Sequence, residues 1–179
     1  LGTVVVEDRV GAEGTIGAKV CAEAPPDGYT ICILPDQTFT TNPIIHPEAN
    51  FDPFKALAPI TRPYYLTQVF AVNTSINVKN FAELAALAHA KPGTLNYMAP
   101  SLSKVAFMEA FNKQNGTDIV RVPFKGGGDA VNSMLTGTTQ IAIFGIGNLV
   151  SFINAGKIIG LAVDGDARSP LAPNIPTFK

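Results

Sequence analysis

The residues best suited to bind a ligand lie near the start of the sequence, where GAEGTIG at positions 11–17 places a glycine at every third position. Glycine adopts backbone angles that other residues avoid, so this spacing is typical of a tight loop. The loop follows a β-branched run at 4–7 and leads into a small-residue segment at 15–24, which predicts a strand, a glycine loop and a helix. The first turn of such a helix has unpaired N–H groups and a dipole that favours an anion, and Thr15 adds a hydroxyl there. The sequence therefore predicts an anion-binding loop.

A second interpretation of this loop is the dinucleotide site of a Rossmann-like oxidoreductase fragment. Asp36 follows the predicted strand at 29–34, about 20 residues beyond the loop, where an acid that binds a ribose would stand. The spacing is G-x-x-G-x-x-G and not G-x-G-x-x-G, however, and Pro35 intervenes before Asp36. A tight turn without any ligand is a third possibility, so the loop alone does not decide among them.

The other reactive side chains do not form a recognisable catalytic or metal centre. Cys21 and Cys32 are the only cysteines, and His46 and His89 are the only histidines. None has the spacing of a zinc site, and no nucleophile motif or carboxylate pair is present. We therefore expect no catalytic residue, no metal and no cofactor. The apolar neighbours of both cysteines favour two buried free thiols, while a disulfide between them stays open for an exported protein.

Composition excludes several classes of function. The 179 residues have a formal net charge of −1 and scattered cations, so we expect no nucleic-acid partner. Hydrophobic residues make up 46% and charged residues 15%, yet no uninterrupted apolar run is long enough to span a bilayer. The length allows one sizeable core or two small ones.

Most of the chain predicts alternating strands and helices, which indicates parallel strands covered by helices on both faces. Asn80 and Glu83 form a capping-box pattern that begins a helix, and the sequence KPG at 91–93 ends it. The other predicted helices occupy 15–24, 103–115, 129–136 and 148–155, and the predicted strands occupy 4–7, 29–34, 66–73, 95–98, 119–124, 140–144 and 158–163.

Six ordered blocks carry a resemblance to a known family. They are VVVEDRVGAEGTIGAKV with PPDGYT, NP at 42–43, FDPFKALAPIT at 51–61, AKPGTLNY at 90–97, VPFKGGGDAV at 122–131 and INAGKIIGLAV at 153–163, and ARSPLAPNIPTF follows them. Together they resemble the substrate-binding proteins of tripartite tricarboxylate transporters, the TctC or Bug family of periplasmic receptors. The resemblance covers nearly the whole chain.

The resemblance implies an α/β fold of the type II periplasmic-binding-protein kind, with two parallel-sheet domains and helices on both faces. It places part of domain 1 at 1–70, domain 2 at 71–163 and the start of a return to domain 1 at 164–179. Family members begin before the first block and continue beyond the last, so the resemblance implies a chain truncated at both ends. It also implies a monomeric periplasmic receptor that takes a small organic carboxylate into the cleft between its domains. The partners would be the membrane permease subunits of a tripartite tricarboxylate transporter.

The candidate binding residues lie in four loops beyond the carboxyl ends of predicted strands, where open α/β sheets bind ligands. Lys104 stands where the family commonly has an uncharged polar residue. Phe144 stands where members often have Asp, which favours a ligand without an amino group. The full candidate set is Gly14, Thr15 and Ile16, then Asp36, Gln37 and Thr38, then Ser101, Ser103 and Lys104, and finally Lys125, Gly126 and Gly127.

Overall fold

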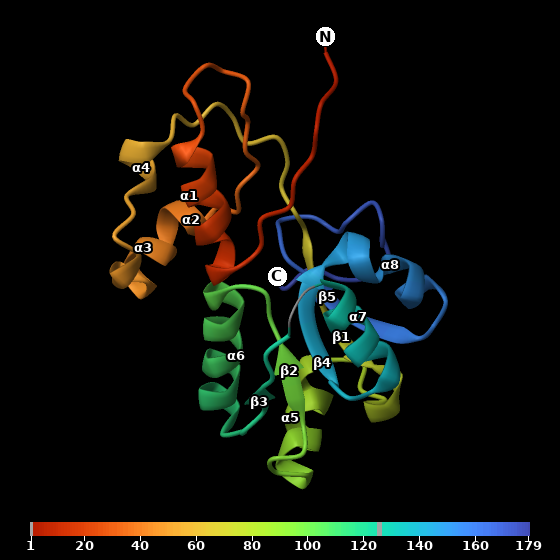
Figure 1. Ribbon diagram of the computed structural model, residues 1–179. Coiled ribbons are helices and arrows are strands. Elements are labelled where there is room, and N and C mark those ends of the chain that lie inside the picture. Colours follow the sequence, from red (N-terminus) through yellow and green to blue (C-terminus); the bar gives the residue numbers. More distant parts are fainter. Residues whose placement is uncertain (1, 125–126) are drawn as a thin grey trace. The chain divides into compact units, whose positions relative to one another are not determined.

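The computed structural model describes residues 2–124 and 127–179, and the chain divides into two compact units, Leu1–Pro63 and Tyr64–Lys179 (Figure 1). They are called unit 1 and unit 2 below, and each is described by itself. The domain boundaries implied by the sequence, 1–70, 71–163 and 164–179, stay predictions for the protein. Among the described residues, no helix combines the length and apolar character needed to cross a membrane.

Unit 1 consists of short helices in the part that the structure describes. Its longest helix begins directly after the glycine loop, at the residue that follows Gly14, whose left-handed φ of 93° suits glycine. The predicted helix at 15–24 is thereby confirmed. The helical elements of unit 1 are η1 Ala12–Gly14, α1 Thr15–Glu23, α2 Gln37–Thr40, α3 Asn42–Ile45, η2 Pro47–Ala49 and α4 Pro53–Ala56.

The prediction of strands at 4–7 and 29–34 is wrong. Neither segment has a strand partner among the described residues. Their apolar side chains are exposed, 78% for Val5 and 73% for Ile31. β-Branched residues suit extended backbone, but a strand is stable only when a neighbouring strand completes its ladder of hydrogen bonds. Composition alone therefore overpredicts strands in this unit.

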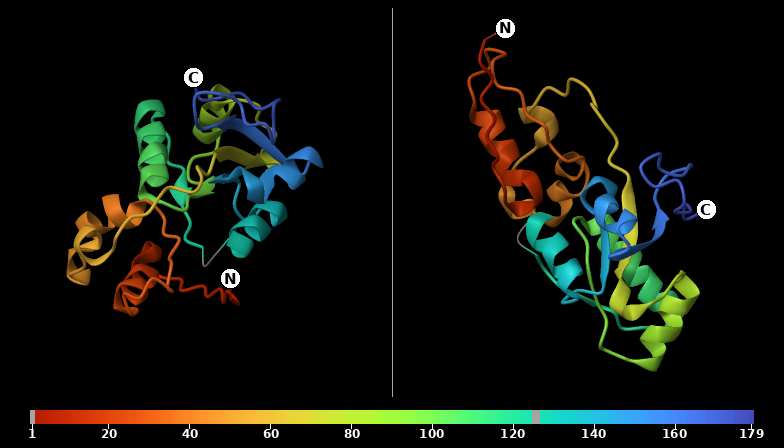
Figure 2. Two further views of the ribbon diagram at one scale, coloured as in Figure 1. Left: turned by 90° about the horizontal axis from the view of Figure 1, so that it is seen from above. Right: turned by 90° about the vertical axis from the view of Figure 1, so that its right-hand side faces the viewer.

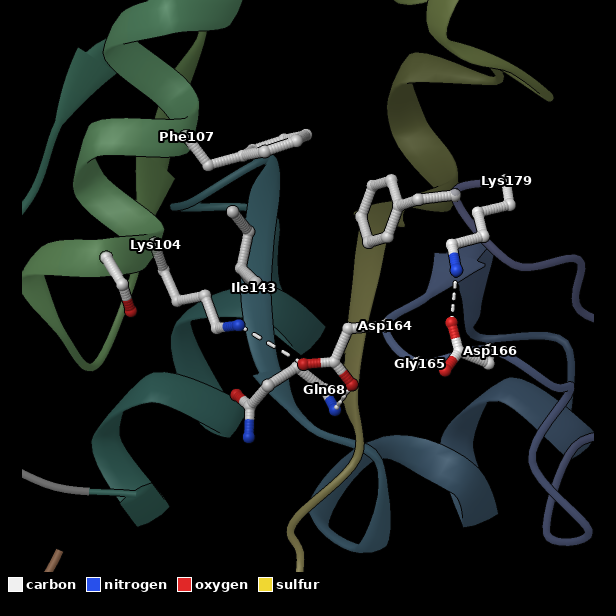
Figure 3. Close-up of a pocket in the computed structure, with 10 residues that line it drawn as sticks. Gln68, Lys104, Phe107, Ile143, Asp164, Gly165, Asp166 and Lys179 are labelled. Atoms are coloured by element: carbon white, nitrogen blue, oxygen red, sulfur yellow. Dashed lines mark hydrogen bonds and ion pairs between the residues drawn. The ribbon is translucent and has the colours of Figure 1, made fainter. Parts of the chain in front are cut away.

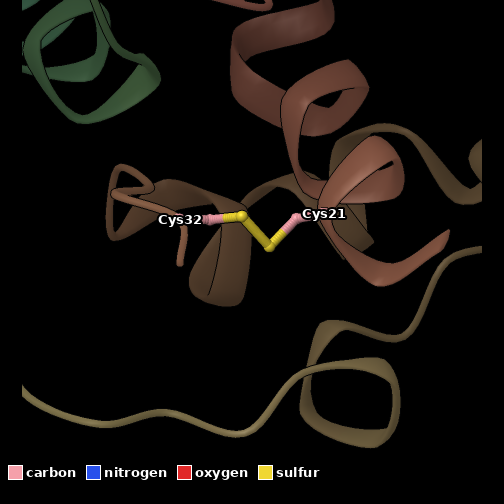
Figure 4. Close-up of a disulfide and its surroundings, with 2 residues drawn as sticks. All are labelled: Cys21 and Cys32. Carbon is pink, nitrogen blue, oxygen red and sulfur yellow. A yellow bond between two sulfur atoms is a disulfide. The ribbon is translucent and has the colours of Figure 1, made fainter. Parts of the chain in front are cut away.

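A disulfide joins Cys21 to Cys32, which corrects the preference for free thiols (Figure 4). Cys21 lies in α1, and Cys32 lies in the segment predicted as a strand. Their Cα atoms are 6.3 Å apart, within the range that a disulfide spans. The bridge therefore ties the helix after the glycine loop to a segment that no strand ladder holds.

Unit 2 contains one mixed five-stranded sheet in the order β3-β2-β4-β1-β5. β2 runs parallel to β3 and β4, whereas β1 runs antiparallel to β4 and β5. Every residue of β1 and β4 is buried, which explains the apolar runs at 69–72 and 141–144. The strands are β1 Gln68–Asn73, β2 Asn96–Met98, β3 Val120–Arg121, β4 Ile141–Gly145 and β5 Ile158–Val163.

Helices cover both faces of this sheet (Figures 1 and 2). On one face, Leu84 of α5 and Met108 of α6 pack against alternate strand residues such as Phe70. On the other, Met134 of α7 and Leu149 of α8 pack against the residues in between. The elements are η3 Thr74–Ile76, α5 Phe81–Ala90, α6 Leu102–Asn115, α7 Gly127–Thr136 and α8 Ile146–Asn154.

The predicted α/β fold with helices on both sides is confirmed, but the sheet is mixed where a parallel sheet was expected. Alternation of strands and helices indicates how the strands are connected. It does not determine whether each strand runs parallel or antiparallel to its neighbours, as β1 shows. β1 is buried on both faces like a parallel strand, yet its partners β4 and β5 run the opposite way. The strand predicted at 119–124 is shorter than expected, because only two of its residues pair with β2.

Local sequence signals account well for α5 and α6. The Asn80 side chain accepts a hydrogen bond from the Glu83 N–H at 2.9 Å, and the Glu83 carboxylate accepts one from the Lys79 N–H at 2.8 Å. α6 ends at Gly116, whose φ of 61° closes the helix in the left-handed conformation. Both boundaries match the sequence prediction within one residue.

A buried tyrosine connects β2 to α6. The hydroxyl of Tyr97 donates to Oε1 of Glu109 at 3.2 Å, and the tyrosine is fully buried. Burial and the neighbouring carboxylate raise the pKa of Tyr97 to about 12. This phenol therefore stays protonated in the folded protein at pH values where an exposed tyrosine ionises.

Candidate functional site

A cavity with a volume of about 390 Å³ lies in unit 2 (Figure 3), within the range of small-molecule sites. Its walls come from the first turns of α6, the first residue of β1, the middle of β4 and the segment after β5. The lining residues are Gln68, Ser103, Lys104, Phe107, Ile143, Asp164, Gly165, Asp166, Phe178 and Lys179.

An ion pair between Lys104 and Asp164 spans the cavity (Figure 3). Nζ of Lys104 donates to Oδ2 of Asp164 at 3.2 Å, and the two side chains are only 26% and 17% exposed. Lys104 reaches the cavity because it lies in the first turn of α6, and Asp164 because it directly follows the buried strand β5. Water screens such a pair less than an ion pair on the surface.

Asp164 also holds the start of β1. Its Oδ1 accepts the backbone N–H of Gln68 at 2.7 Å, and its own N–H donates to the Gln68 carbonyl at 2.9 Å. The Tyr65 hydroxyl donates to Oδ2 at 3.4 Å. One carboxylate thus joins the beginning of β1, the end of β5 and the first turn of α6.

Sequence reasoning missed Asp164 and Gln68. A signal for Asp164 was present, because it follows the strand predicted at 158–163 and the same rule selected the other loops. Gln68 gave no such signal, since it opens a strand that runs antiparallel to its neighbours.

Gln68 is buried, with 9% of its surface exposed, and its side chain is only half satisfied. Its Nε2 donates to the Leu66 carbonyl at 3.2 Å, whereas its Oε1 has no hydrogen-bond partner among the described residues. A buried acceptor without a donor costs free energy, so each such atom calls for an explanation. This atom belongs to a residue that lines the cavity.

The remaining walls are apolar or exposed. Phe107 and Phe178 pack edge to face with ring centroids 5.2 Å apart, and Ile143 adds a buried aliphatic surface. Lys179 pairs with Asp166, but both side chains are largely exposed, so water screens this pair. The cavity therefore combines one half-buried ion pair with an apolar body.

Of the serines predicted to bind a ligand, Ser103 lines this cavity and Ser101 does not. Ser101 precedes α6 in extended backbone, as a capping residue does, but its side chain makes no cap bond. Its hydroxyl instead lies 3.0 Å from the hydroxyl of Ser103. Ser103 and Lys104 therefore both line the cavity, with Ser101 beside Ser103, and their role in ligand binding stays a prediction.

In unit 1, a small cavity adjoins the glycine loop and is lined in part by Thr15, Thr38 and Asn42. Nδ2 of Asn42 donates to Thr15 Oγ1 and to the Glu13 carbonyl, each at 3.0 Å. Nε2 of Gln37 donates to the same carbonyl at 3.2 Å. These amides hold the backbone of the glycine loop, so part of this predicted site serves the fold itself.

The structure brings Gly14, Thr15, Gln37 and Thr38 together in unit 1. A Cβ placed on Gly14 would lie 3.2 Å from Thr38 Oγ1, a close approach that favours glycine here. Asn42 joins them and was missed, although the sequence block NP contained it. The other predicted residues are dispersed: Ile16 and Asp36 are exposed, Gly127 begins α7, and Lys125 and Gly126 lie outside the described residues.

Within residues 2–124 and 127–179, no group of three His, Cys, Asp or Glu side chains is placed to hold a metal ion. His46 instead contacts Glu48, with 3.1 Å between Nδ1 and Oε1. The pKa of Glu48 is lowered by its own backbone hydrogen bond and by His46.

A family model described as "Tripartite tricarboxylate transporter family receptor" matches residues 1–179. The chain belongs to this family. Among curated members, a UPF0065 protein of Bordetella bronchiseptica is 28% identical, and the match covers 98% of this chain and 52% of that protein. The chain thus spans about half the length of the curated relatives it matches.

Solved structures of similar proteins support the same family assignment. One described as a periplasmic transporter has a TM-score of 0.86 and 34% identity, over 97% of this chain and 59% of that one. Rpa4515 of R. palustris, solved with adipate, has a TM-score of 0.87 and 27% identity over 97% and 59% of the two chains. MatC of Rhodopseudomonas palustris, with bound malate, has a TM-score of 0.78 and 25% identity over 93% and 57%.

Membership in a family of transporter receptors removes the support for a dinucleotide-binding oxidoreductase. That interpretation also required a strand before the glycine loop, and residues 2–10 form none. The glycine loop leads directly into α1. The family consists of substrate-binding receptors rather than enzymes.

Proposed function

We propose that the protein is a periplasmic receptor that captures a small organic carboxylate and delivers it to the membrane subunits of a tripartite tricarboxylate transporter. The observation that carries this proposal is the match of the receptor family to the whole chain. Among the similar structures, one is described as a periplasmic transporter and two were solved with the carboxylates adipate and malate. The proposal extends to this chain what those descriptions say of its relatives.

The unit 2 cavity supplies chemistry suited to a carboxylate. Lys104 offers a charge-assisted hydrogen bond, Ser103 offers a hydroxyl, and Phe107 and Ile143 offer an apolar surface for the carbon chain. In the structure, the Asp164 carboxylate takes the position of an anion beside Lys104. A ligand carboxylate would share Lys104 with Asp164 or would displace Asp164 from Lys104.

The unit 1 residues are proposed as a second set of binding groups. Gly14 and Thr15 stand at the start of α1, where the helix dipole favours an anion. Their own N–H groups donate to the Gly11 and Ala12 carbonyls, so the Thr15 hydroxyl is the group offered to a ligand. Thr38 Oγ1 is buried and has no partner among the described residues, so it retains hydrogen-bonding capacity. The proposed binding residues also include the others predicted from the sequence, namely Ile16, Asp36, Gln37, Ser101 and the segment 125–127.

A panel of thermal shifts tests ligand class directly. Adipate and malate should raise the melting temperature in a concentration-dependent way, because a ligand that binds only the folded state stabilises it. NAD and NADP serve as the contrasting ligands. Stabilisation by a dinucleotide, with no response to any carboxylate, would contradict the receptor function.

The transporter partnership needs a cellular experiment. Deleting the gene for the full protein should reduce uptake of the carboxylate that binds it, and the protein should fractionate with the periplasm. Unchanged uptake together with a cytoplasmic location would rule out delivery to a membrane transporter.

A further inference from the structure

One oxygen of Asp164 accepts hydrogen bonds from two different parts of unit 2. Nζ of Lys104 donates to Oδ2 at 3.2 Å, and the Tyr65 hydroxyl donates to the same atom at 3.4 Å. Lys104 lies in the first turn of α6, whereas Tyr65 lies in the segment that leads into β1. A hydrogen bond stabilises an ionised carboxylate, so the bond from Tyr65 reduces what Asp164 gains from its pairing with Lys104.

Asp164 does not depend on Lys104 for its position. Its Oδ1 accepts the Gln68 backbone N–H at 2.7 Å, and its own N–H donates to the Gln68 carbonyl at 2.9 Å. The neighbouring residues Val69 and Val163 pair between β1 and β5 and are fully buried. The carboxylate is therefore held beside Lys104 by the sheet itself and stays there when another anion approaches.

Lys104 is the partner better able to change its position. Its ammonium stands on a flexible four-carbon stem, and the side chain is 26% exposed at the wall of the cavity. Figure 3 shows this stem reaching from α6 toward Asp164. A ligand carboxylate that enters the cavity must therefore compete with a fixed internal carboxylate for one cation.

We infer that Asp164 is a built-in competitor for the carboxylate of the ligand, and that Tyr65 is a positioning residue that moderates this competition. Tyr65 is not among the residues that line the cavity, so it acts through Asp164. By donating to Oδ2, it weakens the hold of Asp164 on Lys104 and leaves Lys104 more available to the ligand. This inference rests on the proposed receptor function.

Calorimetry of the whole chain with malate and with adipate tests the two residues in opposite directions. Asp164→Asn removes the competing charge but keeps an acceptor oxygen for the Gln68 N–H, so binding should become at least about fivefold tighter. Tyr65→Phe removes one hydroxyl and should weaken binding roughly two- to tenfold. Residues that merely supported the fold would not change the affinity in opposite directions.

Two double substitutions show whether these effects pass through the same contacts. In the Asp164→Asn chain, Tyr65→Phe should leave the affinity unchanged, because no competing charge remains for the phenol to moderate. In the Lys104→Met chain, Asp164→Asn should improve binding by less than about twofold, because the shared cation is absent. A general effect of negative charge on the ligand would persist in that chain.

Tyr64→Phe and Asp118→Asn are the matched controls. Tyr64 precedes Tyr65 and is similarly exposed, 61% against 64%. Asp118 also accepts a backbone N–H, from Gly93 at 2.9 Å, but is not among the residues that line the cavity. Both controls should leave the affinity unchanged. Amide hydrogen exchange in β1 and β5 checks that each variant keeps its fold.

The outcomes separate the two proposals. If no small carboxylate binds either the native or the Asp164→Asn chain, the receptor function is contradicted and this inference falls with it. Binding that appears only in the Asp164→Asn chain supports both. If carboxylates bind the native chain and Asp164→Asn binds them no more tightly, the receptor function stands and the competition is refuted. A Tyr65→Phe effect that is absent, or equal in both backgrounds, overturns the role of Tyr65.

Discussion

Removing the disulfide should destabilise unit 1 without affecting unit 2. Cys21 and Cys32 are separated by 11 positions, so their bridge closes a short loop in the unfolded chain. The chain-entropy relation gives about 3 kcal/mol of stabilisation for a loop of this size. The effect belongs to unit 1 because both cysteines lie there, and the segment around Cys32 has no strand ladder to hold it.

The measurement must distinguish the two units, because a chain with two compact units does not have one unfolding free energy. Amide hydrogen exchange does this residue by residue. In the Cys21→Ser/Cys32→Ser variant, the amides of α1 should exchange about a hundredfold faster than in the oxidised chain. The amides of β1 and β4 should keep their rates.

Reductant provides the control for this experiment. It should reproduce the effect of the double substitution in the native chain and do nothing further to the variant. Unchanged exchange in α1 after reduction would refute the reasoning. Equal acceleration in α1 and in β1 would refute it as well, since the bridge would then support the whole chain.

Three further predictions concern unit 2. Asn80→Ala removes the cap of α5 and should lower the free energy of unfolding of unit 2 by about 1 kcal/mol, measured by amide hydrogen exchange in β1 and β4. The folded state keeps the Tyr97 proton up to about pH 12, whereas the unfolded state loses it near pH 10. Stability should therefore be unaffected by Tyr97 below pH 10 and fall as the pH rises from 10 to 12, and melting curves of Tyr97→Phe should show a shallower fall over this window. Lys104→Met should weaken carboxylate binding by roughly ten- to a hundredfold in calorimetry, because one charge-assisted hydrogen bond is lost. Lys113→Met, an exposed change on the same helix, should leave the affinity unchanged, and equal losses in both variants would contradict a specific role for Lys104.

Sequence predicts the fold of unit 2 well where local signals are complete. The capping box at Asn80 and the glycine at 116 mark helix ends through bonds between near neighbours, and both appear in the structure. The segment predicted at 158–163 forms β5 over the same residues. In these elements, the residues that decide the structure lie within a few positions of each other.

Long-range partners explain the errors. The runs at 4–7 and 29–34 have strand composition, but composition does not supply the neighbouring strand. The antiparallel direction of β1 depends on where the chain returns after α7, which no window around residues 68–73 contains. The disulfide likewise depended on geometry that the spacing of the two cysteines left open.

The sequence predicted which loops contribute residues to the candidate site, but not which of those residues contact each other. The rule that ligands lie beyond strand ends selected Ser103 and Lys104, which line the cavity, and their role in binding stays a prediction. It did not pair Lys104 with Asp164, 60 positions away, because that ion pair exists only after α6 and β5 have packed into one unit. Gln68 could not be selected from the sequence, since its importance lies in one buried oxygen without a donor.

The most direct test of the account is calorimetric titration of the whole chain with malate and, separately, with its neutral dimethyl ester. The account holds that the protein recognises a small carboxylate through its charge, so malate should bind and the ester should bind at least about tenfold more weakly. Equal affinity for the two compounds, or binding of neither malate nor any other small carboxylate, would contradict it.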